Sequence, residues 1–133
     1  MTDVQKDLLK KDLCARLDTN LVCSIYRVDD YGVGYRDEIL SGYCKGDNWY
    51  EFYFGDDCGI GIDDVSKIKP YLFPMSSMTE EQAKDFRELC IEDMFGVMYY
   101  SEKSYDYLNA NHFDWRGLIP MGLANDATGL NIY

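Results

Sequence analysis

The sequence predicts an α+β fold: an N-terminal helix, a curled antiparallel sheet or small barrel over residues 21–72, and a helical C-terminal part. Two observations favour this class. Apolar residues recur at helical spacing near the start and after residue 79, whereas β-branched and aromatic residues with glycine-rich turns fill the stretch between. The 133 residues fit a single domain, and a hydrophobic content of 47% is typical of a packed globular core.

The first predicted element is an amphipathic helix over residues 4–17, because Leu9, Leu13 and other apolar residues fall near helical spacing with charged residues between them. Residues 21–28 follow as a strand, since they are rich in β-branched and apolar side chains. Residues 29–32 are Asp-Asp-Tyr-Gly, which is the composition of a turn, and should end that strand.

The clearest predicted strand pair is a hairpin of residues 35–44 and 49–54, because residues 45–48 between them have the composition of a short turn. A further short strand is expected over residues 59–65. The chain then reaches Pro70 through a single helical or extended turn. Glycines between these runs allow the bends that a curled sheet or a small barrel requires.

The predicted helical part begins after a connector bounded by Pro70 and Pro74, which is too short to be a domain linker. Thr79 and Gln82 form a capping-box signature that starts a helix. The apolar residues expected to continue it repeat three and four positions apart, with Gly96 as an early stop: Ala83, Phe86, Cys90, Met94 and Val97.

Two more helices are predicted downstream. Ser101 caps one that runs to about residue 109, and residues 115–123 form a short third helix interrupted at Pro120. The tail of residues 127–133 is either a last strand or a loose end, and the sequence leaves both alternatives open.

Three segments have an unusual order of residues: DLCARL at 12–17, IKPYLFPMSSMTEE at 68–81 and YLNANHFDWRGLI at 107–119. Through these segments, nearly the whole chain resembles small uncharacterised proteins of Bacteroides-type gut bacteria and their phages. The resemblance implies a bacterial or phage protein and implies no particular activity.

The net charge of −11 and a pI near 4.3 argue against direct binding to nucleic acid, which needs clustered lysines and arginines. Anionic membrane surfaces are disfavoured for the same reason. A basic protein partner is favoured, because the field of the chain would speed their encounter. An acidic surface that only maintains solubility would explain the same charge.

The five cysteines form no Cys-x-x-Cys pair and leave one over, so the sequence predicts neither a zinc site nor a full disulfide framework. Residues 1–7 lack the basic start and apolar core of a signal peptide, and no run is long enough for a spanning helix. We therefore expect a cytoplasmic protein with no metal and no cofactor.

The leading functional hypothesis is a non-enzymatic accessory protein that binds another protein through an acidic, tyrosine-rich face. The candidate residues of that face cluster in the strand region: Asp56, Asp57, Asp63, Asp64, Tyr50 and Tyr53. Tyrosines supply large, rigid contact area at interfaces. The alternatives are that the aspartates solvate turns, that the tyrosines belong to the core, or that the face mediates self-association.

The rival hypothesis is a small enzyme or ligand-binding domain with a site around His112, the single histidine, formed with Tyr107, Asp114 and Trp115. If Asp106 or Asp114 oriented its ring, His112 could act as a base for Cys90 or a tyrosine hydroxyl. A lone histidine between aromatic residues is more often a packing residue, so the sequence favours a protein without catalytic activity. Arg116 is expected to stack on an aromatic ring or to pair with Asp114.

Overall fold

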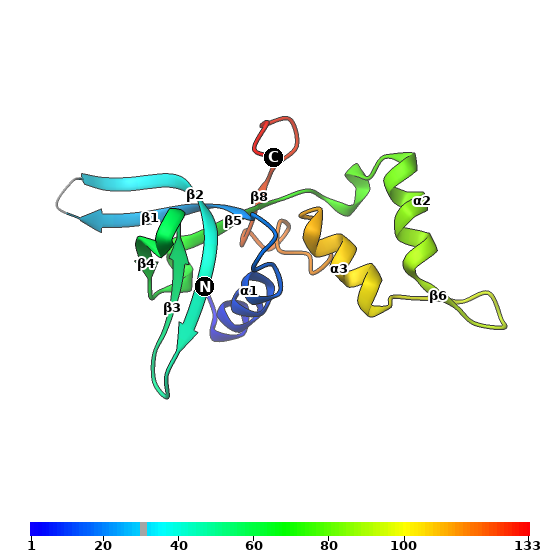
Figure 1. The fold of residues 1–133 in the computed structure, drawn as a ribbon, viewed down its shortest axis with the longest axis horizontal. Helices are drawn as coiled ribbons and strands as arrows, with labels where there is room; N and C mark the ends of the chain where they lie inside the picture. Colours follow the sequence, from blue (N-terminus) through cyan, green and yellow to red (C-terminus); the bar gives the residue numbers. More distant parts are fainter. Residues whose placement is uncertain (30–31) are drawn as a thin grey trace.

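The computed structural model describes residues 1–29 and 32–133 (Figure 1). Its helices and strands follow the order α1 (Asp3–Ala15), β1 (Val22–Asp29), β2 (Gly32–Lys45), β3 (Tyr50–Phe54), β4 (Ile60–Ile62), β5 (Ile68–Leu72), α2 (Glu80–Leu89), β6 (Ile91–Glu92), β7 (Met98–Tyr99), α3 (Glu102–Ala110) and β8 (Asn125–Asp126). The fold is therefore α+β with an N-terminal helix, as the sequence predicts. The predicted turn after β1 falls on Asp30 and Tyr31, which lie outside the described residues.

The main sheet has six strands in the order β4-β3-β2-β1-β5-β8. Its neighbouring strands run antiparallel except for β5 and β8, which pair in parallel at Tyr71 with Asn125 and at Leu72 with Asp126. Within residues 21–72 the strands pair antiparallel as the sequence predicts, but the sheet gains the parallel strand β8 from outside this range, and the alternative of a small barrel is wrong. The sheet is open: its two edge strands, β4 and β8, do not pair with each other.

The predicted hairpin of β2 and β3 is confirmed, and β2 is the longest strand. Its first part pairs with β1 from Gly32 to Ile39, and its second part pairs with β3 from Leu40 onward. The register shifts between Leu40 and Gly42, where a bulge lets one strand serve two partners. The predicted strand at residues 59–65 is shorter than expected, because a 3-10 turn at Val65–Lys67 follows β4.

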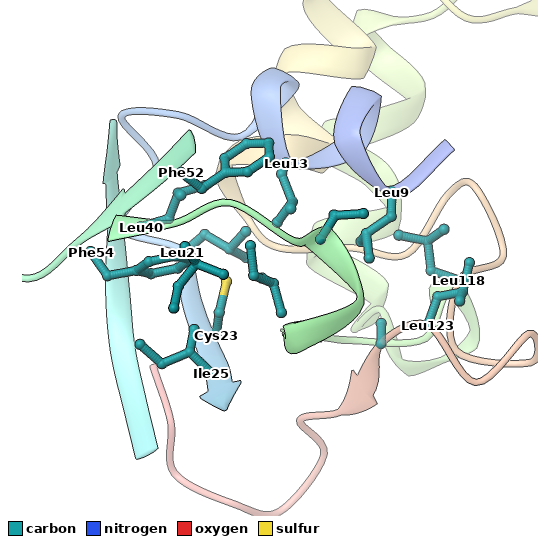
Figure 2. Packing of buried hydrophobic residues seen from close by; sticks show 14 of the residues in the cluster. Leu9, Leu13, Leu21, Cys23, Ile25, Leu40, Phe52, Phe54, Leu118 and Leu123 are labelled. Carbon is teal, nitrogen blue, oxygen red and sulfur yellow. The ribbon is translucent and has the colours of Figure 1, made fainter. Parts of the chain in front are cut away.

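Helix α1 begins in a capping box in which Thr2 and Gln5 exchange side-chain to backbone hydrogen bonds. It lies against the sheet and directs Leu9 and Leu13 into the main hydrophobic cluster (Figure 2). We call this the sheet cluster. Its fully buried members come from α1, the strands and the C-terminal segment, and they include Leu9, Leu13, Leu21, Cys23, Ile25, Phe52, Phe54, Val65, Leu72 and Leu118.

Helix α2 begins in the capping box of Thr79 and Gln82 that the sequence predicts. The expected continuation through Met94 and Val97 is wrong, because the helix ends at Leu89 and the next residue adopts an extended conformation. The following residues form an antiparallel hairpin, β6–β7, instead. Only Phe86 of this helix is buried, so packing does not hold a longer helix in place.

Helix α3 begins at the predicted cap, Ser101, and is confirmed. The predicted third helix at residues 115–123 is wrong. This segment runs as a series of turns in which Gly117 and Gly122 adopt left-handed conformations, with φ of 78° and 75°. A proline between two such glycines prevents a continuous run of helical hydrogen bonds. The C-terminal part is therefore only partly helical.

Residues 80–110, comprising α2, the β6–β7 hairpin and α3, extend away from the sheet (Figure 1). We call this region the arm. A second, smaller hydrophobic cluster lies at its base, with Phe86, Leu108 and Phe113 buried. Within the described residues, no helix has the length and apolar character needed to cross a membrane.

Candidate functional site

His112 lies just beyond α3 in a left-handed backbone conformation, with φ of 62°. The two hydrogen bonds of a Schellman motif close the helix there: Phe113 N–H donates to the Leu108 carbonyl (2.9 Å) and His112 N–H donates to the Asn109 carbonyl (3.2 Å). Glycine usually occupies this position, because a side chain in this conformation costs about 1 kcal/mol. Contacts of the histidine side chain must therefore offset that cost.

The principal contact of this kind is a parallel stack with the ring of Tyr133. The two ring centroids lie 3.7 Å apart with an interplanar angle of 13°. The Tyr133 hydroxyl accepts a hydrogen bond from Val22 N–H (3.0 Å) and donates one to the Tyr71 carbonyl (2.8 Å). The last residues of the tail are thereby attached to β1 and β5 and hold one face of the histidine.

Burial keeps the His112 ring neutral. Removal from water, together with the positive charge of Arg16, lowers the pKa of His112 to about 4. Its Nδ1 atom is buried and has no hydrogen-bond partner among the described residues. Burial also raises the pKa of the Tyr133 hydroxyl above its ordinary value. Both rings of the stack are therefore uncharged at neutral pH.

A cavity of about 460 Å³ opens beside this stack. It is lined by Phe73, Ser77, Gln82, Ala110, Asn111, His112, Phe113, Thr128, Gly129 and Tyr133. The volume lies within the range of small-molecule sites. The lining combines aromatic rings with hydroxyl and amide groups, and none of these residues carries an Asp, Glu, Lys or Arg side chain.

The structure brings only His112 of the predicted pocket residues to this cavity. Asp114 is buried and accepts hydrogen bonds from Leu118 N–H (2.7 Å) and Ile119 N–H (2.8 Å), so it stabilises a turn. Trp115 donates its indole N–H to the Asn109 side chain (2.8 Å).

The remaining partners proposed for His112 also have other contacts or lie elsewhere. Tyr107 places its hydroxyl 3.5 Å from the Gln82 carbonyl. Cys90 donates its thiol to the Phe86 carbonyl (3.4 Å), and neither Cys90 nor Asp106 lines the cavity. The described lining therefore offers binding groups without an assembled nucleophile and base.

A buried ion cluster that the sequence analysis missed lies next to this region. Asp12 and Arg16 on α1 are both fully buried and form two hydrogen bonds, of 2.9 and 3.1 Å. Arg16 also donates to the Phe113 carbonyl (2.6 Å), and Arg116 donates to Asp12 (3.1 Å). Arg116 stacks over Trp115 as expected, with its guanidinium carbon 4.0 Å from the ring centroid, but it pairs with Asp12 rather than with Asp114.

A sequence signal for this cluster was present. Asp12 and Arg16 occur at the same helical spacing as Leu9 and Leu13, so both charged residues fall on the apolar face of α1. Opposite charges four residues apart on a buried face indicate an internal ion pair. The pair joins the N-terminal helix to the segment that carries His112.

The acidic residues predicted for a protein-binding face lie in two groups. Asp56 and Asp57 form an exposed 3-10 turn before β4, whereas Asp63 and Asp64 follow β4. Asp64 accepts hydrogen bonds from the Ser66 hydroxyl (2.7 Å) and backbone N–H (3.0 Å), which lower the pKa of its carboxyl group. It therefore caps the following turn.

The two tyrosines predicted for this face project from opposite sides of β3, because they are three residues apart on a strand. Tyr50 packs against the sheet cluster, and its hydroxyl accepts a hydrogen bond from Val65 N–H (2.8 Å). Tyr53 donates to Glu51 (3.1 Å). The six predicted residues therefore do not lie on one face of the sheet edge formed by β3 and β4.

The tip of the arm is a hairpin whose turn is fixed by Asp93. One carboxylate oxygen of Asp93 accepts from Phe95 N–H (2.8 Å) and Val97 N–H (3.0 Å), and these bonds lower its pKa. Asp93 N–H donates to the Val97 carbonyl, and Gly96 adopts a φ of 79°. The turn therefore has a defined shape although it is exposed.

Large apolar side chains cover this tip. Met94 and Phe95 are 89% and 82% exposed, the highest values for large apolar residues in the described chain. The other exposed apolar or aromatic residues of this stretch are Ile91, Val97, Met98, Tyr99 and Tyr100. We call residues 91–100 the apolar tip.

The chain matches no protein-family model, no curated protein and no solved structure. In the part of the chain that the structure describes, no three His, Cys, Asp or Glu side chains are grouped to hold a metal ion. Function must therefore be inferred from the apolar tip, the β3–β4 edge and the His112 cavity.

Proposed function

We propose that this chain is a non-enzymatic accessory protein of a gut bacterium or its phage that acts by binding another protein. The observation that carries the proposal is the apolar tip, which presents Met94 and Phe95 to solvent at the far end of the arm (Figure 1). Contiguous exposed apolar residues on a soluble fold are typical of protein contacts. This exposure supports a contact through the arm rather than through the β3–β4 edge.

Folding does not account for these side chains. Met94 and Phe95 belong to neither hydrophobic cluster, and Asp93 fixes the turn that presents them. A turn that is already ordered loses little conformational entropy when a partner binds. Methionine adapts to irregular apolar surfaces, and aromatic residues dominate the energetics of many interfaces. The tip thus combines adaptable and rigid anchors.

Charge favours one kind of partner: a protein whose apolar groove is bordered by lysines and arginines. Acidic residues outnumber basic ones along the arm. The sequence of this region contains the acidic residues Glu80, Glu81, Asp85, Glu88, Glu92, Asp93, Glu102 and Asp106, and the basic residues Lys84, Arg87 and Lys103. A second copy of the chain is a poorer partner, because each copy carries a net charge of −11.

The test compares capture of host proteins by the wild type and by a Met94→Ser, Phe95→Ser variant, followed by titration of the purified partner. A Val4→Ser, Val33→Ser variant is the matched control, because these valines are also exposed, at 78% and 66%. We expect the control to bind as the wild type does and the tip variant to lose at least about tenfold in affinity. Equal binding by all three proteins would disprove a role for the tip.

A second variant tests whether the partner binds at the β3–β4 edge rather than at the arm. Replacement of Asp56, Asp57, Asp63 and Asp64 by asparagine removes charge while it retains side chains that suit turns. If this variant alone loses the partner, the contact lies at the β3–β4 edge. Sedimentation velocity over a range of protein concentrations tests self-association, and a dimer that the tip variant abolishes would replace the outside partner by a second copy.

A further inference from the structure

The His112 cavity is assembled from four separate segments of the chain. Phe73 and Ser77 come from the connector after β5, Gln82 from α2, residues 110–113 from the end of α3, and residues 128–133 from the tail. Phe73 N–H donates to the His112 carbonyl (2.8 Å), so the connector and the helix end are joined directly. The tail is held by the Tyr133 hydroxyl. The walls are thus fixed by hydrogen bonds within the chain.

Two features of His112 are not needed to build these walls. Its backbone adopts a conformation that glycine would adopt without strain, and its buried Nδ1 has no partner among the described residues. A residue in a strained conformation with an unpaired buried polar atom is more typical of a binding site than of a packing position. Retaining a histidine there positions a neutral aromatic ring at the cavity.

The lining selects for the charge of a ligand. No side chain that lines the cavity has a carboxylate, ammonium or guanidinium group, so an ionic ligand would lose water without gaining a side-chain counter-ion. The negative field of the whole chain further disfavours anions. An uncharged ligand meets neither obstacle.

The same lining selects for shape and hydrogen bonding. Phe73, Phe113 and Tyr133 supply aromatic surface, and planar rings stack or pack edgewise against such side chains. Thr128 and Asn111 supply polar groups to the lining; the Thr128 hydroxyl also bonds to the Asp126 carboxylate, and the Asn111 amide donates to the Tyr107 carbonyl (2.9 Å). An aromatic centre with a polar border matches a planar ring that carries donors and acceptors on its edge.

We propose that this cavity binds an uncharged, planar heteroaromatic small molecule, whose ring packs among Phe73, Phe113 and Tyr133 while its polar edge bonds to the side chains at the border. The site is independent of the apolar tip, because it uses the opposite end of α3 from the hairpin. Ligand binding and protein binding can therefore be tested separately on the same chain.

The test is a titration of the ¹⁵N-labelled protein, followed by NMR, with three uncharged probes: adenosine, thymidine and nicotinamide. We expect at least one probe to shift the amide resonances of His112, Phe113, Thr128 and Gly129 saturably. Ribose, which lacks the ring, should cause no such shifts. Adenosine monophosphate, which adds negative charge to the same ring, should bind about tenfold more weakly than adenosine.

Matched variants make the result specific to the site. Tyr133→Phe and Tyr133→Ala both remove the hydroxyl that anchors the tail, but only the alanine variant removes the ring. We expect Tyr133→Ala to lose about tenfold in affinity and Tyr133→Phe to lose less, because the phenylalanine keeps the ring although it lacks the anchoring hydroxyl. Thr128→Val, at an exposed position, removes a hydroxyl of the lining together with its bond to Asp126, so it should weaken binding with only a small fall in thermal stability.

The proposal is overturned if none of the three probes gives saturable shifts at these residues in the millimolar range. It is also overturned if the shifts are the same in Tyr133→Ala and Thr128→Val as in the wild type. Equal affinity for adenosine and its monophosphate would contradict the inferred selection against charge.

Discussion

The sheet and the arm are built from the same kinds of element but differ in how much apolar surface they bury. The sheet cluster contains fully buried residues such as Leu13, Phe52 and Phe54, contributed by several elements. The smaller cluster at the base of the arm has three buried residues, Phe86, Leu108 and Phe113, and Phe86 is still 9% exposed. None of residues 91–100, the apolar tip, is buried. The contrast indicates that the sheet supplies most of the stability, whereas the arm presents a surface.

The largest expected effect tests whether the two clusters contribute unequally. Phe52→Ala should lower the free energy of unfolding by about 3–5 kcal/mol, because it leaves a cavity in the sheet cluster. Phe86→Ala should have a smaller effect on global unfolding, since its neighbours can relax toward solvent. Urea denaturation of both variants measures the difference.

Hydrogen exchange sharpens this comparison. In Phe86→Ala we expect faster amide exchange in α2 and α3 with little change in β1 and β2, because the arm can open locally. Uniformly faster exchange across the whole chain would show instead that the sheet and the arm unfold as one unit.

A second test breaks the connection between the two regions. Asp12→Ala should cost about 3 kcal/mol, because it leaves Arg16 buried without its carboxylate partner and releases Arg116. Asp7→Ala on the same helix is the control. Its partner, Lys10, lies 3.8 Å away at the surface, so the cost should stay below about 1 kcal/mol. Equal thermal shifts for both variants would contradict a structural role for the buried cluster.

Helix capping gives a smaller effect that is local to the arm. Thr79→Ala removes the side-chain oxygen that accepts from Gln82 N–H, and should cost about 1 kcal/mol. Thr79→Ser keeps that oxygen and should restore stability. We expect the loss to appear as faster exchange at the first turn of α2, and a change confined to the sheet would argue against it.

The smallest effect is the pH dependence that His112 contributes. Its pKa is lowered to about 4 from the ordinary value of 6.5, so the unfolded chain binds this proton at a higher pH than the folded chain. The contribution is complete above about pH 6.5 and is lost as the pH falls toward 4. His112→Asn, which tolerates the left-handed conformation, should flatten this part of the stability curve measured by urea denaturation.

Local signals in the sequence predicted several elements well. The Thr79 capping box and the Ser101 cap mark real helix starts, and the turn composition of residues 45–48 marks a real hairpin. Each of these depends on residues close together in the chain. The false extension of α2 through Met94 arose because exposed apolar residues at helical spacing resemble a buried stripe.

Features that depend on distant residues were not predicted. The parallel pairing of β5 with β8 and the stack of Tyr133 on His112 join segments whose proximity only the complete fold establishes. Of the predicted pocket residues, His112 alone reaches the cavity, because Asp114 is used by nearby backbone groups. The sequence could single out His112 as a candidate and could not identify the residues that surround it in the fold.

The buried guanidinium of Arg16 constrains the order in which the chain can mature during synthesis. Its carbonyl acceptor, Phe113, lies 97 residues further along the chain, and Arg116 lies 104 residues beyond Asp12. A ribosome makes the helix and most of the sheet long before either partner emerges. Until then Arg16 has Asp12 but lacks its carbonyl acceptor, so we expect the buried ion cluster to be completed only after residues 113–116 have been made.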